Sequence, residues 1–153
     1  MLPYRTDVHA ISKERLIDIL PFVLYYLMLF IFTASNPFFL DKDILFSKIA
    51  FWLLENGFHP VLPDSIDPGY PPLLAYLLAF GWNITGKSLL LSHAIILPFT
   101  LGIIWQVHRL LSCFIPIKAV VPAMLIVLAD PTLMAQTTLF SADIAMLFFF
   151  LLA

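Results

Sequence analysis

Long apolar runs constrain this chain more than any other feature of its sequence. Residues 16–34 form one such run and residues 89–107 another, and each is close to the roughly 20 residues that a helix needs to cross a bilayer. Hydrophobic residues make up 61% of the chain and charged residues 12%, against about 45–50% and about 25% in soluble domains. We therefore expect an all-α, polytopic membrane protein with about four to five transmembrane or re-entrant helices.

The charge and the cysteine content limit the kinds of partner and of covalent link that such a chain can have. The net charge is −2 and the eight Lys and Arg residues are scattered, so the sequence offers no basic patch for nucleic acid. Cys113 is the single cysteine, cannot form an internal disulfide, and is expected to pack as a small hydrophobe. Membrane lipids are the expected partners.

Basic residues set the expected orientation. Three basic residues, Arg5, Lys13 and Arg15, lie before the first apolar run, and acids follow that run. No cleavable signal sequence is recognisable. The positive-inside tendency then puts residues 1–15 in the cytoplasm as an N-terminal segment. Residues 16–153 become the membrane domain, with residues 36–72 as its first external loop.

The first external loop holds five of the ten acids and is expected to be the working surface. Within it, residues 41–56 predict an amphipathic helix on the membrane surface, because Leu45, Ile49 and Leu53 recur with Trp52 at helical spacing. A glycine follows directly at position 57 and is expected to end this helix. The prolines after it favour an extended, turn-rich path.

Further helical segments are expected after the loop. Residues 73–82 are apolar but short for a span. The helix over 89–107 is expected to end at His108 and Arg109, residues 120–129 form another apolar run, and residues 132–153 are long enough for one last helix.

Simple alternation of these segments conflicts with the positive-inside tendency. It would place Arg109 and Lys118 outside and Lys87 inside. The conflict disappears if residues 73–82 or residues 130–140 enter the membrane without crossing it.

Asp143 is the most informative polar residue of the apolar part. A carboxylate inside an apolar span costs about 3 kcal/mol on insertion scales and usually faces a cavity or a partner. The alternative is an aspartate near the interface, or one that is hydrogen-bonded to a neighbouring helix. Asp130 precedes Pro131 and is expected first of all to form a turn or a helix N-cap.

Asp41 and Asp43 lie two residues apart at the head of the predicted surface helix. Capping and the helix dipole favour a carboxylate there, while a pair of acids is also suited to bind a metal ion or to act as a general base. His59 and Tyr70, in the same loop, are candidates for contact with a polar substrate or for interfacial anchors. Glycine-rich phosphate loops and nucleophile elbows are absent from the sequence.

Three stretches of the chain carry a family resemblance: DKDILFSKIAFWLLENGFHP, DPGYPPLLAYLLAFGWNITGKS and LADPTLMAQTTLFSADIAMLFFFLLA. Their order and spacing resemble the N-terminal part of GT-C glycosyltransferases, and within them the bacterial relatives of protein mannosyltransferases and of the aminoarabinose transferase acting on lipid A. The resemblance covers nearly all of the chain from Leu16 on. It implies a catalytic cavity at the outer face of a bacterial inner membrane. There a sugar would pass from polyprenyl phosphate to a lipid, glycan or protein hydroxyl.

The resemblance also implies where the site lies. The acid pair in the first loop of the family falls near Asp41, Lys42 and Asp43, of which Asp43 matches the second acid of the pair. The second family acid matches Asp143, and the proline pair of the loop matches Pro71 and Pro72.

The resemblance also implies two chemical roles: removal of a proton from the acceptor hydroxyl and stabilisation of the lipid phosphate. Asp43 or Asp41 would remove the proton of the acceptor hydroxyl. Positive charge for the lipid phosphate would come from Lys42, Lys48 or Arg109, or from a divalent metal ion held by the two acids.

Two functions of other classes are alternatives to glycosyl transfer. The chain could be part of a transporter or channel in which Asp143 couples ions, or a small, non-enzymatic membrane subunit. Because the sequence stops inside the apolar run FFFLLA, we expect it to be the N-terminal portion of a longer chain.

Overall fold

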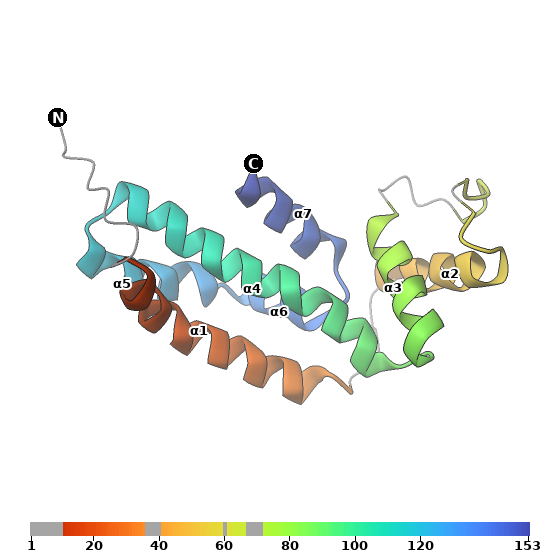
Figure 1. Ribbon diagram of the computed structural model, residues 1–153, viewed down its shortest axis with the longest axis horizontal. Coiled ribbons are helices and arrows are strands. Elements are labelled where there is room, and N and C mark those ends of the chain that lie inside the picture. The colour runs from red at the N-terminus through yellow and green to blue at the C-terminus, as the bar shows by residue number, and fades with distance from the viewer. Residues whose placement is uncertain (1–10, 36–40, 60, 67–71) are drawn as a thin grey trace.

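The computed structural model describes residues 11–35, 41–59, 61–66 and 72–153, with the side chains of residues 11–15 and 41–44 left out of that description. All regular structure in these ranges is helical (Figure 1). The helices are α1 (Ile11–Thr33), α2 (Asp41–Glu55), α3 (Leu73–Thr85), α4 (Leu89–Phe114), α5 (Ile117–Leu128), α6 (Pro131–Thr138) and α7 (Ala142–Leu152).

Two helices are long and apolar enough to cross a membrane. They are the Leu16–Thr33 part of α1 and the whole of α4, and the pair α5 and α6, bent by 65° at its break, has the composition of a third span. Helices α3 and α7 are apolar but shorter. The described residues thus agree with an all-helical membrane protein that has two to three helices of spanning length, and the expected number of four to five stays a prediction.

Helix α4 is the centre of the molecule. It contacts α1, α3, α5, α6 and α7, and Figure 1 shows it running beside α1, with α2 and α3 beyond one end of the pair. Nε2 of His108, near the end of α4, lies 3.7 Å from Oδ2 of Asp18, near the start of α1. The two long helices are therefore antiparallel.

The end of α4 differs from the prediction. The helix does not stop at His108 and Arg109 but continues to Phe114. Residues 110–114 contain no proline or glycine that would break it, and the first breaker is Pro116. Cys113 lies in this added turn and is exposed, so the expectation that it packs as a buried hydrophobe was wrong.

The last predicted helix is two helices. Helix α6 ends at Thr138 and α7 starts at Ala142, with Leu139 extended and Ser141 as N-cap. The hydroxyls of Thr137 and Thr138 donate to backbone carbonyls three residues earlier, at 2.8 Å each. Such back-bonding competes with the helical ladder, and it coincides here with the end of α6.

Helix α2 has the predicted amphipathic spacing, while its place on the membrane surface stays a prediction. Ile49 and Leu53 are fully buried, and Lys48 and Glu55 are exposed. The buried face packs against α3, and both helices lie beyond one end of the α1–α4 pair (Figure 1). After α2, Gly57 has φ +66°, the left-handed conformation of a C-terminal cap that glycine adopts without strain.

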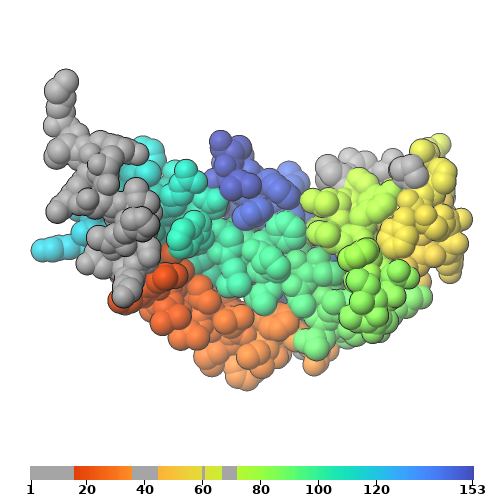
Figure 2. All heavy atoms as spheres, in the orientation of Figure 1, coloured from red at the N-terminus to blue at the C-terminus, as the bar shows by residue number. Residues whose placement is uncertain are grey.

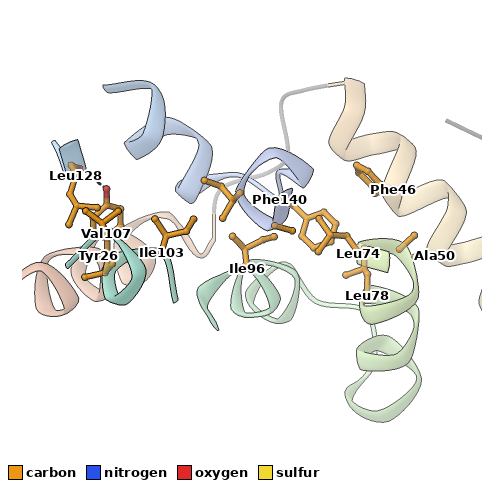
Figure 3. Packing of buried hydrophobic residues seen from close by; sticks show 14 of the residues in the cluster. Tyr26, Phe46, Ala50, Leu74, Leu78, Ile96, Ile103, Val107, Leu128 and Phe140 are labelled. Carbon is orange, nitrogen blue, oxygen red and sulfur yellow. Dashed lines mark hydrogen bonds between the residues drawn. The ribbon is translucent and has the colours of Figure 1, made fainter. Parts of the chain in front are cut away.

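The core is continuous along the molecule. Figure 3 shows it extending from Tyr26 and Leu128 at one side, past Ile103 and Ile96, to Phe140. Apolar side chains also cover much of the outside of α1, which forms one edge of the molecule in Figure 2. Its exposed large side chains are Leu16, Ile17, Leu20, Leu24, Tyr25, Met28, Ile31 and Phe32. An apolar surface of this extent is typical of a helix that faces lipid.

Candidate functional site

Two segments that carry candidate acids meet at one end of the core. The rings of Phe46, in α2, and Phe140, just before α7, are edge-on with centroids 6.2 Å apart, and both side chains are almost completely buried (Figure 3). Asp43 precedes Phe46 by three residues, and Asp143 follows Phe140 by three. The Phe46–Phe140 contact therefore brings the start of α2 close to the start of α7.

Asp143 lies in the first turn of α7 and is exposed. Its backbone N–H donates to the Ser141 hydroxyl at 3.2 Å, which caps the helix. A carboxylate in a first turn is stabilised by the positive end of the helix dipole. Asp143 thus lies at an accessible helix start and not in the middle of an apolar helix, so its position fits a cavity mouth and an interface equally.

The two acids at the head of α2 are placed only by their backbone. Asp41, Lys42 and Asp43 form the first turn of α2, but their side chains lie outside the described part of the chain, as do Tyr70 and Pro71. In the residues that are described, no group of three or more His, Cys, Asp or Glu side chains could hold a metal ion. The predicted metal ligands Asp41 and Asp43 fall outside that search.

His59 and Pro72 take part in the connection between α2 and α3. The His59 carbonyl accepts a 3.2 Å hydrogen bond from the Tyr76 hydroxyl, and its Nδ1 accepts one from the Val61 N–H at 3.4 Å. Pro72 is the N-cap residue of α3. His59 lines a hollow of about 380 Å³ together with Trp52, at the opposite end of α2 from Asp43.

The predicted cations separate into two groups. Lys48 is exposed in the middle of α2, on the helix that carries the first-loop acids. Arg109 lies near the far end of α4, beside His108, about 30 Å along the helix from Leu89 by helical rise. The structure therefore does not bring Arg109 to the Phe46–Phe140 contact.

Sequence reasoning missed the contacts at the break between α5 and α6. The Tyr26 hydroxyl donates to the Leu128 carbonyl at 2.6 Å, and the Tyr25 hydroxyl to Sδ of Met134 at 3.6 Å. Asp130 accepts from the Leu133 N–H at 2.9 Å, which confirms the predicted N-cap. The sequence signal for the break is the Asp130–Pro131 pair after an apolar run, but nothing in it points to the two tyrosines.

Comparison of the chain with protein-family models, with curated proteins and with solved structures gives no match. Function is therefore inferred from the residues of the chain and their geometry. Of the predicted site residues, Asp43 and Asp143 each lie three residues from a member of the Phe46–Phe140 contact, and Asp41 and Lys42 share the first turn of α2 with Asp43. His59 and Arg109 lie elsewhere.

Proposed function

We propose that this chain is part of the catalytic domain of a GT-C-like membrane glycosyltransferase, which moves a sugar from a polyprenyl-phosphate donor to a lipid, glycan or protein hydroxyl. The observation that carries the proposal is the contact between Phe46 and Phe140. The resemblance implies that Asp43 and Asp143 share one cavity, and this contact brings their helix starts to the same end of the core although they are far apart in the sequence.

The chemistry requires a base on one side of the sugar and a stabilised phosphate on the other. Asp43 or Asp41 takes the proton of the acceptor hydroxyl, whose oxygen attacks the anomeric carbon. The bond from that carbon to the phosphate oxygen breaks, and polyprenyl phosphate leaves with both electrons of the bond. Each step balances without any oxidant or reductant.

Several groups near the α2 and α7 starts suit the leaving phosphate. Lys42 and Lys48 supply positive charge. The starts of α2 and α7 add the partial positive charge of helix N-termini. A divalent metal ion on Asp41 and Asp43 would stabilise the same oxygens.

The antiparallel pairing of α1 and α4 supports the proposed orientation, with residues 1–15 in the cytoplasm. Helix α3 has 13 residues, about 20 Å by helical rise, which is too short to cross about 30 Å of hydrocarbon. We propose that it lies across the outer end of the bundle, so that α4 returns to the cytoplasmic side. Arg109 and Lys118 then lie on the same side as the basic N-terminal segment, in agreement with the positive-inside tendency.

The proposed course of the chain through the membrane also places the last three helices. The bent pair α5 and α6 runs outward again as a third span, and α7 enters from the outer face. The Phe46–Phe140 contact, the start of α7 and the first external loop then all lie on the outer side of the bacterial inner membrane.

A transfer assay in membranes tests this function. Polyprenyl-phosphate sugars are supplied as donors, and the wild-type chain is compared with Asp43→Asn and Asp143→Asn at matched expression. Loss of a general base is expected to lower transfer at least about 100-fold. Asp64→Asn is the matched control, because Asp64 is an exposed acid of the same loop that lies away from the Phe46–Phe140 contact. Unchanged transfer in both site variants would refute the proposed roles.

One observation favours a second candidate function, an ion pathway. Helices α5 and α6 are bent by 65° at a break that holds Asp130, and broken helices with a carboxylate at their ends bind ions in transporters. Asp130→Asn in proteoliposomes would then abolish cation or proton flux and leave sugar transfer intact. Absence of flux in the wild-type chain would exclude this candidate.

A further inference from the structure

A groove of about 650 Å³ lies between α1 and α5. Its walls are Pro21, Phe22 and Tyr25 on α1, and Val121, Pro122 and Leu125 on α5. The volume falls in the range of about 300–1,000 Å³ that is usual for ligand pockets. Leu125 is 59% exposed, so the groove is open along its side.

The groove arises because α1 and α5 both pack on α4 and present prolines to the space between them. Pro21 and Pro122 are compact side chains in the middle of apolar helices. Phe22 follows Pro21 and Leu125 follows Pro122 along the lining, so the walls of the groove are mostly apolar.

Among the described residues of α5, a lysine lies one helical turn before the lining of the groove. Lys118 is exposed in the first turn of α5 and lies on the same helix face as Val121, Pro122 and Leu125, three, four and seven residues later. On the α1 side the described acid is Asp18, whose carboxylate faces His108 at 3.7 Å. The mouth of the groove is therefore suited to an anion.

The length of the groove matches one leaflet of a bilayer. The lining along α5 runs from Val121 to Ala129, about 12 Å by helical rise, and the turn that carries Lys118 brings this track to about 16 Å. That is about half of the roughly 30 Å hydrocarbon thickness. The far end is bounded by Tyr25, whose hydroxyl is bonded to Met134 of α6. A second transmembrane helix would need a groove about twice as long.

From length, apolar lining and charge together, we propose that this groove holds one acyl chain of an anionic phospholipid from the cytoplasmic leaflet. The phosphate of the lipid pairs with Lys118. The inference rests on the proposed orientation of α1 and α5 but not on sugar transfer, so each can fail without the other. The site lies at the opposite end of the bundle from the Phe46–Phe140 contact, and a bound chain would add to the Tyr26–Leu128 hydrogen bond that already joins α1 to α5.

Native mass spectrometry of the full chain, released from detergent, tests the proposal. Dioleoyl phosphatidylglycerol and dioleoyl phosphatidylcholine are offered separately, because they share their acyl chains and differ in net charge. We expect phosphatidylglycerol to be retained about fivefold more, the factor that one lysine near an anionic headgroup supplies. Lys118→Gln should remove this preference, and Lys118→Glu should reverse it.

A variant of the groove itself separates the acyl chain from the headgroup. Leu125→Trp fills the channel from an exposed position and should lower retention of both lipids. Lys87→Gln is the matched control, because Lys87 is an exposed lysine at the turn between α3 and α4, away from the groove.

Three outcomes would overturn the proposal. Equal retention of the two lipids by the wild-type chain would remove the role of Lys118. Retention that is unchanged in Lys118→Glu and Leu125→Trp would place the bound lipid elsewhere. A lipid-free dimer that Leu125→Trp converts to a monomer would assign the groove to a second copy of the chain.

Discussion

The Tyr26 hydroxyl donates a 2.6 Å hydrogen bond to the carbonyl of Leu128, the last residue of α5 (Figure 3). Both residues are 2% exposed. The last carbonyls of a helix have no partner within it, and in an apolar surrounding an unpaired carbonyl is costly. A side chain from the first membrane helix thus stabilises the break between α5 and α6.

Tyr26→Phe is expected to destabilise the protein by about 1–3 kcal/mol, because the Leu128 carbonyl is left buried without its donor. Thermal unfolding in detergent micelles, followed by circular dichroism, measures the change. Tyr25→Phe is the matched control, since Tyr25 is 42% exposed and its hydroxyl bonds a thioether sulfur, and it should cost clearly less. Equal effects of the two variants would contradict this account of the break.

Gly102→Ala is expected to loosen α7 from α4. A Cβ at Gly102 would lie 2.3 Å from Cε2 of Phe148, and that ring also packs edge-on against Phe99 and Phe149. Overpacking of this kind costs about 1–3 kcal/mol, more than the roughly 1 kcal/mol that alanine gains over glycine in a helix.

The control for this prediction is Gly81→Ala, whose Cβ would meet only the side-chain ends of Leu91 and Ile95, at 3.0 Å and beyond. Thermal unfolding of both variants gives the comparison. A Gly102→Ala chain as stable as the wild type would show that Phe148 can move away at little cost.

Phe140→Ala is expected to cost about 3–5 kcal/mol, the range for deleting a buried aromatic ring, and to separate the starts of α2 and α7. Phe140→Leu keeps much of the volume and should cost less. If the Phe46 contact holds the two acid-bearing segments together, sugar transfer should fall in Phe140→Leu by more than its loss of folded protein explains. Transfer that simply follows the amount of folded chain would argue against that role.

Cys113 provides a direct test of orientation, because it is exposed near the end of α4 and is the single cysteine of the chain. A membrane-impermeant maleimide added to intact cells should leave it unlabelled, and permeabilised cells should show labelling. In a Cys113→Ser background, Asp64→Cys should be labelled in intact cells, because position 64 belongs to the first external loop. The reverse pattern would invert the proposed topology, and labelling of both positions in intact cells would contradict a span between them.

Local signals in the sequence determined much of the helix content. Apolar runs of spanning length predicted α1 and most of α4. The spacing of Ile49 and Leu53 predicted the apolar face of α2, and Asp130 before Pro131 predicted a turn or cap. Each of these features depends on residues within a few positions of one another, so the sequence carries it without knowledge of the fold.

Tertiary contacts decided the arrangement of these helices. In so apolar a chain many helices are hydrophobic on all sides, so periodicity does not tell which face meets which partner. The pairing of Asp18 with His108, the bond from Tyr26 to Leu128 and the meeting of Phe46 with Phe140 each join residues about ninety or more positions apart. The sequence by itself therefore determined the two helices of membrane length, α1 and most of α4, but not the break within residues 132–153. Only long-range packing decided that α1 and α4 are antiparallel and that the two acid-bearing segments meet at one end.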